Sequence, residues 1–90
     1  MSSGRASVEA MDDMIRLLTK VQQLQDDIAK DLRQKYESIG SDWNDEQYQK
    51  MEEEISEMIR YLSECSGALS LGTTRLQLRK RMLEEYLNMH

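Results

Sequence analysis

The sequence predicts an all-α protein, an antiparallel two-helix hairpin that forms a four-helix bundle by dimerisation. Proline is absent and glycine occurs only four times in 90 residues, while residues that lose little rotamer freedom in a helix abound. Apolar residues recur every three or four positions in two long stretches, which is the spacing of amphipathic helices. One turn signal, at residues 40–44, separates the stretches. A chain of this length supports a single domain, expected over residues 7–90.

The first predicted helix covers about residues 7–39 and follows a flexible tail of small and polar residues over 1–6. Ser7 fits an N-cap, and Glu9 favours the positive end of the helix dipole. Gly40 accepts the left-handed conformation that closes a helix. The apolar positions are Val8, Met11, Met14, Leu18, Val21, Leu24, Ile28, Leu32, Tyr36 and Ile39. They predict one continuous helix.

The second predicted helix covers about residues 45–88, where Asn44 and Gln47 fit a capping box. A heptad seam is built from an apolar residue at every seventh position and the residue three places after it. Its members are Tyr48, Met51, Ile55, Met58, Leu62, Cys65, Leu69, Gly72, Leu76, Arg79, Leu83 and Tyr86. Gly67 and Gly72 each destabilise a helix interior by about 0.8–1.0 kcal/mol, so a break there stays open. The unchanged heptad phase on both sides favours continuity.

Folding the chain about Trp43 sets apolar residues at equal distances from the turn opposite each other. The predicted pairs are Tyr36 with Tyr48, Leu32 with Met51, Ile28 with Ile55, Leu24 with Met58, Val21 with Leu62, Leu18 with Cys65, Met14 with Leu69 and Val8 with Leu76. In this register the end of the second helix, with Leu83, Tyr86 and Leu87, extends beyond the first helix. The ring of Trp43 closes the end of the core or serves as a recognition residue.

A second apolar flank remains uncovered in this hairpin, and contiguous exposed apolar patches are uncommon on monomers. We therefore expect the flank, the turn tryptophan and the protruding end to bind a partner. The predicted partner-binding residues are Trp43, Ile15, Leu17, Ile59, Leu71, Leu78, Arg79, Met82, Leu83, Tyr86 and Leu87. The expected partner is a second copy or a paralogous hairpin, or a helical domain of a larger effector.

The residues predict no catalytic, cofactor-binding or metal site. His90 is the only histidine and Cys65 the only cysteine, so neither a catalytic base nor a disulfide framework is indicated. The glutamate run at residues 52–54, with Glu57, is typical of a solvated face. The net charge of −5 argues against nucleic-acid binding, which requires a basic surface. The protein is predicted not to be an enzyme.

The chain has no apolar run of the roughly 18 residues needed to span a bilayer, and no signal-peptide core follows its N-terminus. We expect a protein that is cytoplasmic when made and inserts into no membrane. Export without a cleavable signal peptide stays open.

The segment Gly40-Ser41-Asp42-Trp43-Asn44-Asp45, between two long helices, resembles the turn of the WXG-type family of early secreted antigenic target proteins. The pattern from Trp43 to Met51 is similar to WXG-like proteins of bacterial toxin and conflict gene clusters. Two departures stand out: Asp45 replaces the motif glycine, and Tyr86 is followed by His90 where the family's C-terminal export signal has an acidic residue.

The resemblance implies antiparallel hairpins that dimerise as four-helix bundles and act as substrates, partners or adaptors of type VII secretion. The expected function is thus a secretion-associated partner or adaptor for a larger toxin or effector protein. The alternative is a structural helical subunit of a non-secreted bacterial or phage-like assembly.

Overall fold

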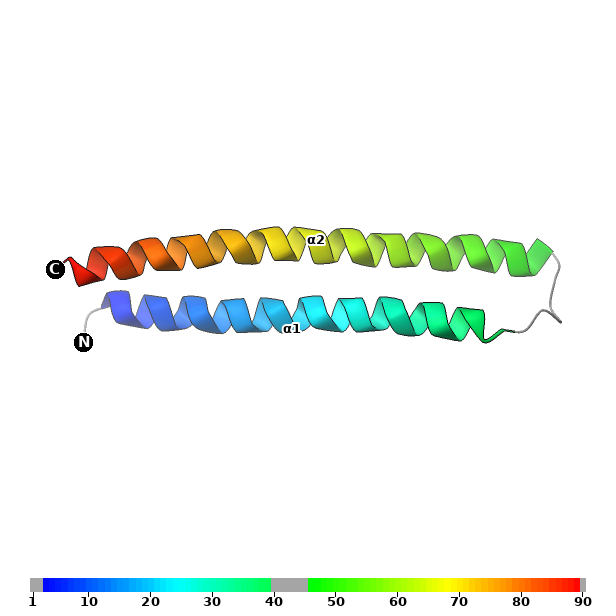
Figure 1. The fold of residues 1–90 in the computed structure, drawn as a ribbon, viewed down its shortest axis with the longest axis horizontal. Coiled ribbons are helices and arrows are strands. Elements are labelled where there is room, and N and C mark those ends of the chain that lie inside the picture. The colour runs from blue at the N-terminus through cyan, green and yellow to red at the C-terminus, as the bar shows by residue number, and fades with distance from the viewer. Residues whose placement is uncertain (1–2, 40–45, 90) are drawn as a thin grey trace. The chain divides into compact units, whose positions relative to one another are not determined.

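The computed structural model describes residues 3–39 and 46–89, which form two helices. Helix α1 spans Ser3–Glu37 and helix α2 spans Glu46–Asn88, and no strand occurs in these two ranges (Figure 1). The all-α prediction with two helices is therefore confirmed. The predicted turn at 40–44, including Trp43, the Gly40 closure and the Asn44 cap, lies outside the described residues.

Helix α1 begins four residues earlier than the sequence predicts, so the tail expected over residues 1–6 is helical from Ser3 onward. A packing contact accounts for the early start. A Cβ atom built on Gly4 would lie 2.6 Å from Leu87 Cδ2, which shows that the first turn of α1 packs closely on the end of α2. This contact stabilises helical residues that local propensity alone leaves frayed.

Helix α1 ends at Glu37, two residues before the predicted end, in a tightened turn. The Ser38 amide donates to the carbonyls of Gln34 and Lys35 at 3.0 and 3.2 Å, and the Ile39 amide donates to Tyr36 at 3.1 Å. The Ser38 hydroxyl donates to the Lys35 carbonyl at 2.6 Å. These bonds satisfy carbonyl groups that the last helical turn would otherwise leave without partners.

Helix α2 runs without interruption through Gly67 and Gly72, as the constant heptad phase predicts. It starts at Glu46 and ends at Asn88, within one residue of the expected bounds. A Cβ atom built on either glycine would meet no heavy atom within 4 Å. The glycines are therefore not required by close packing within the chain.

The domain expected over residues 7–90 divides into two compact units. Unit 1 comprises Met1–Gln22 and Ala68–His90, and unit 2 comprises Gln23–Gly67. In each unit a segment of α1 lies alongside a segment of α2 that runs in the opposite direction (Figure 1). Each unit is thus an antiparallel helix pair with its own seam.

The seam of unit 1 is formed by half-buried residues that face the other helix. They are Gly4, Val8, Met11, Ile15, Leu18 and Gln22 on α1, and Leu69, Thr73, Leu76, Lys80, Leu83 and Leu87 on α2; Thr73 is the most deeply buried member, with 8% of its surface exposed. Thr73 satisfies its hydroxyl within its own helix by donating to the Leu69 carbonyl at 2.8 Å.

The seam of unit 2 combines apolar and polar residues. Its half-buried or buried members are Gln25, Ala29, Leu32 and Tyr36 on α1, and Tyr48, Met51, Ile55, Ile59, Leu62 and Ser66 on α2. The rings of Tyr36 and Tyr48 stack with centroids 5.7 Å apart and planes inclined by 26°, so this predicted pair is confirmed. Ser66 donates from its hydroxyl to Asp26 Oδ1 at 3.0 Å.

Away from the tyrosine pair, the predicted register is wrong. Val8 lines a hollow with Glu84 and Leu87, about two to three helical turns beyond Leu76, its expected partner. In unit 2, Asp26 accepts a hydrogen bond from Ser66. The predicted register places Asp26 opposite the segment between Ile55 and Met58, more than two helical turns before Ser66. The predicted overhang of α2 is therefore wrong as well, because Leu87 packs on Gly4 instead of extending past α1.

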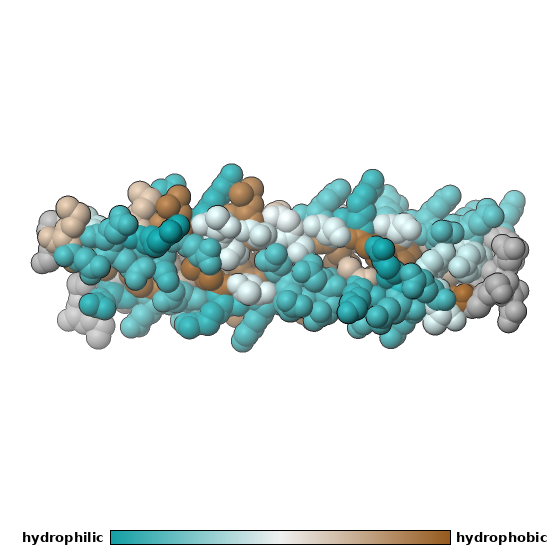
Figure 2. Space-filling model, viewed as in Figure 1, coloured by the Kyte–Doolittle hydropathy of each residue, from teal (hydrophilic) through white to brown (hydrophobic). Residues whose placement is uncertain are grey.

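No hydrophobic side chain within residues 3–39 and 46–89 is fully buried, and the two buried residues there are Ser66 and Thr73. Figure 2 shows one face, on which hydrophilic residues predominate and hydrophobic ones gather mainly along the line between the helices. None of the described helical segments is long and apolar enough to cross a membrane. The paired helices leave much apolar surface in contact with water.

Candidate helix-binding face

Each helix carries a second row of residues beside its seam, and each member of this row immediately precedes a seam residue. We call this row the stripe. Over residues 14–28 of α1 it contains Met14, Leu17, Val21, Leu24 and Ile28, and over residues 54–86 of α2 it contains Glu54, Met58, Tyr61, Cys65, Ala68, Gly72, Arg75, Arg79, Met82 and Tyr86. Outside these two stretches the same position holds mostly polar residues, namely Ser7, Ala10, Asp31, Lys35, Gln47 and Lys50. Antiparallel helices are related by a two-fold rotation about the normal to their common plane. Within a unit, stripe residues of both helices therefore lie on the same side.

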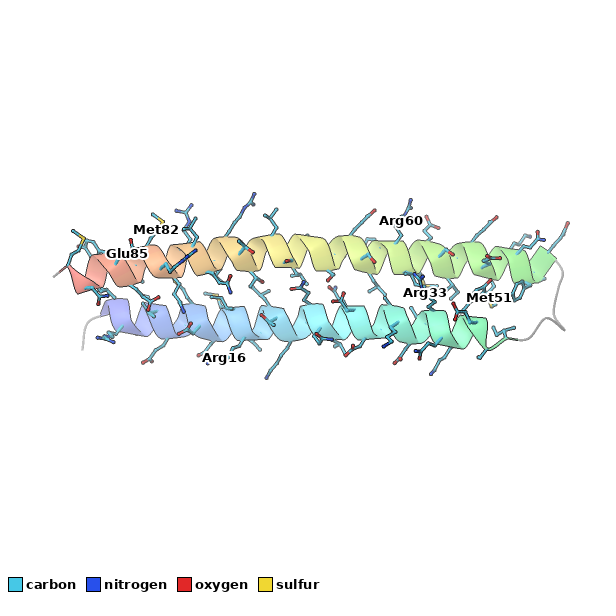
Figure 3. All side chains as sticks on the ribbon, viewed as in Figure 1. Arg16, Arg33, Met51, Arg60, Met82 and Glu85 are labelled. Carbon is cyan, nitrogen blue, oxygen red and sulfur yellow. The ribbon has the colours of Figure 1, made fainter. Side chains whose placement is uncertain are left out.

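In unit 1 the stripe of α1 is wholly apolar and exposed. Met14 is 44% exposed, Leu17 60% and Val21 45%. On α2 the stripe contributes Met82, which points away from α1 in Figure 3, together with the two exposed arginines described below. Leu71 and Leu78 lie one position further from the seam and are also exposed. This side of unit 1 is an apolar face with cationic groups.

In unit 2 the corresponding side is hollowed. A groove of about 650 Å³ is lined by Leu32, Glu54, Glu57, Met58, Tyr61 and Leu62. Leu24 and Ile28 continue the stripe along α1 and are exposed to solvent. Met51 does not belong to this exposed side, because it is a seam residue and lies between the helices in Figure 3. The groove has an apolar floor and carboxylates at its margin, and its size suits a row of side chains from a partner helix.

Polar contacts across the seam fix how each helix pair is rotated. In unit 1 Lys80 Nζ donates to Asp12 Oδ1 at 2.6 Å, with side chains only 25% and 40% exposed. The hydrogen bond to Asp12 raises the pKa of Lys80, and its attraction to the Asp12 and Glu84 carboxylates acts in the same direction. In unit 2 the Ser66–Asp26 bond plays the same orienting part. Both contacts form only when Lys80 and Ser66 face α1, as they do in these seams.

Several predicted partner-binding residues lie on exposed surface, as the flank hypothesis requires. Leu17, Leu71, Leu78, Met82 and Tyr86 are each about half or more exposed. Arg79 is exposed too and belongs to the α2 stripe. In unit 1 these residues gather with Met14 and Val21 on one side of the pair.

The structure places four predicted residues in the seams instead. Ile15, Leu83 and Leu87 are half-buried between the helices of unit 1, and Ile59 is half-buried in unit 2 beside Tyr36. Their assignment to an exposed flank or a protruding end is wrong. Ile15 and Ile59 each follow a predicted seam residue that is exposed instead, and the shifted register places Leu83 and Leu87 beside α1. Trp43 lies outside the described residues.

Sequence reasoning missed the stripe residues that it had assigned to the core. Met14, Val21, Leu24, Ile28 and Met58 were expected in the seam but are exposed. The sequence of α1 does show that two rows of residues with the same spacing, one residue apart, compete for the seam. The row that is buried includes Gln22, Gln25 and Ala29 in its middle, so polarity alone pointed to the wrong row.

The two units differ sharply in charge. Unit 1 contains seven basic and five acidic residues, and unit 2 contains five basic and twelve acidic residues. Their formal net charges are therefore +2 and −7, which together give the −5 of the chain. Within residues 3–39 and 46–89, no group of three or more His, Cys, Asp or Glu side chains is arranged to hold a metal ion.

Comparison of the chain with protein families, with curated proteins and with solved structures finds no significant match.

Proposed function

We propose that this chain is a non-enzymatic helix-binding protein, which dimerises into a four-helix bundle and serves as a type VII secretion-associated partner or adaptor for a larger toxin or effector. The observation that carries the binding role is the absence of any buried hydrophobic side chain in the described residues, beside a continuous exposed apolar stripe on α1. Apolar area removed from water stabilises association by about 25 cal/mol per Å².

The surface area supports the same conclusion. The chain has an accessible surface of 7266 Å², whereas a compact protein of 10.6 kDa has about 5,500 Å². The excess of roughly 1,800 Å² is more than the ~800 Å² that each partner contributes to a standard interface. Covering the stripes with another pair of helices would remove part of this excess from water.

The secretion-associated role depends on the resemblance of residues 40–45 to the WXG-type turn. The antiparallel helix pairs and the exposed stripes are what a hairpin adaptor needs, because a larger protein can lay an amphipathic helix on such a face. No chemical step is involved, and the mechanism is burial of apolar surface.

Sedimentation equilibrium tests the association. We expect the wild type to be a dimer at micromolar concentration and the Leu17→Ser/Leu24→Ser variant to associate at least about a hundredfold more weakly, because each leucine keeps more than half of its surface for a partner. Gln23→Ser is the matched control, since exposed Gln23 follows a seam residue of the same helix and lies on the opposite flank from the stripe. A wild type that is a stable, folded monomer at micromolar concentration would refute the proposal.

The secretion role has a separate test in the native cell. We expect the protein in the culture medium, alone or with its larger partner, only when the type VII secretion ATPase is active. Retention in the cell under both conditions, with the larger partner exported normally, would refute this part of the proposal.

A further inference from the structure

We propose that unit 1 of one copy docks on the grooved face of unit 2 of a second copy, so that the dimer joins unlike units. This inference rests on the proposed function and specifies its partner and arrangement. A symmetric dimer allows two arrangements of these faces, like units together or unlike units together. The stripes alone do not choose between them, because both units present apolar residues.

The charges of the two units favour the arrangement that joins unlike units. Joining like units would bring two units of net charge −7 together, whereas joining unlike units sets +2 against −7 in each contact. At physiological ionic strength charges interact over about 8 Å, so the groups at the contacting faces dominate. Juxtaposed like charges disfavour an interface and complementary ones set its orientation.

The charged groups that line the groove of unit 2 and those in the α2 stripe of unit 1 have the required signs, while Asp31, Lys35 and Lys50 continue the row of unit 2 outside the groove. In unit 2 the groove is lined by Glu54 and Glu57, which flank Met58. The Glu57 carboxylate lies 3.8 Å from Arg60 of the same helix, but its side chain stays 75% exposed, so this ion pair is weak and leaves Glu57 available. The margin of the groove is therefore acidic where a partner helix would enter.

In unit 1 the stripe of α2 supplies the complementary groups. Arg75 and Arg79 are exposed, each immediately precedes a seam residue, and no ion pair holds either of them in the described part of the chain. Met82 follows on the same side, and Leu78 lies next to it. A helix with this alternation of arginine and apolar side chains suits a groove that has an apolar floor and glutamates at its margin.

Small residues also fit this arrangement. Ala68 and Gly72 lie in the stripe of α2, and a Cβ on Gly72 would meet nothing within 4 Å in its own chain. The stripe thus has room for the large Met58 and Tyr61 side chains of a second copy to approach. Unit 2 offers bulky apolar groups, and unit 1 offers arginines next to small residues.

Charge reversal at constant salt tests the arrangement in the full chain. In 0.15 M salt we expect the Glu54→Lys/Glu57→Lys variant to dimerise about ten- to a hundredfold more weakly than wild type, because attraction at both contacts becomes repulsion. If like units were joined, the same variant would dimerise more tightly, since it reduces the charge of −7 that faces itself. The two arrangements therefore predict opposite signs.

The reciprocal variant completes the test. Arg75→Glu/Arg79→Glu alone should also weaken dimerisation, and the chain with all four substitutions should regain affinity within about fivefold of wild type. Circular dichroism shows whether each variant keeps its helices, and the four-substitution chain guards against general loss of folding. No recovery in a fully helical four-substitution chain would overturn the proposal.

Cross-linking reports the arrangement directly. In a Cys65→Ser background, Met58→Cys copies are mixed with Met82→Cys copies and treated with a bismaleimide. Products joining position 58 to 82 should exceed those joining 58 to 58 or 82 to 82, and the reverse excess would overturn the inference. A dimer with the reversed pattern would leave the proposed function intact, whereas a monomeric wild type would remove both.

Discussion

Gln25 occupies the seam of unit 2, and its replacement by leucine should stabilise the fold. The side chain is half-buried, and its Oε1 atom is out of contact with water and has no hydrogen-bond partner among the described residues. An unsatisfied buried acceptor destabilises by about 1–3 kcal/mol. Gln25→Leu removes that acceptor and places apolar surface against α2.

The expected gain combines these two effects. Full burial of a leucine contributes about 1.5–3 kcal/mol, so half-burial contributes about 1 kcal/mol. Added to relief of the acceptor, the free energy of unfolding should rise by about 2 kcal/mol or more. For a domain of this size, that raises the Tm by about 10 °C.

Urea and thermal unfolding followed by far-ultraviolet circular dichroism measure the effect, at one protein concentration because association contributes to stability. Gln23→Leu is the matched control, since Gln23 is exposed and donates to Asp27 at 3.1 Å on its own helix. The control should change the free energy of unfolding by less than about 0.5 kcal/mol. An unchanged or reduced stability of Gln25→Leu would refute the placement of Gln25 in the seam.

Three further predictions follow from individual contacts. Replacing Gly67 or Gly72 by alanine should raise the free energy of unfolding by about 1 kcal/mol each, measured by urea unfolding of protein dilute enough to be monomeric, since a Cβ meets nothing at either position. Lys80→Met should lower the urea midpoint at pH 7, because it removes the ion pair with Asp12. Asp12 raises the pKa of Lys80 in the folded chain, so at pH 7, well below the ordinary lysine value of 10.5, the pair contributes its full stability. That contribution is lost as the pH rises through the higher folded pKa, and there the difference between variant and wild type should fade. Absorbance titration should show a tyrosine component that ionises above the ordinary tyrosine value of 10.0, because a side-chain hydrogen bond with Tyr48 raises the pKa of Tyr36, and Tyr36→Phe should remove that component.

The contact between Gly4 and Leu87 explains why the sequence misplaced both ends of the helix pair. Ser7 is a reasonable local start for a helix, and a turn-centred register makes the last residues of α2 protrude. Neither inference includes packing between the first and last turns of the chain, which are distant in sequence. The contact extends α1 to Ser3 and places Leu87 in the seam.

The sequence by itself determined that the protein is two long helices, because the three-and-four spacing of apolar residues and the absence of proline are local properties. It also favoured continuity of α2 through its glycines and predicted that Tyr36 pairs with Tyr48, and the structure shows both. Only the tertiary structure decided which of two neighbouring rows on each helix is buried. Rows one residue apart differ by about 100° of rotation, and on α1 both are apolar enough to form a seam. Contacts between distant residues, such as Lys80 with Asp12, select one rotation and leave the other row for a partner.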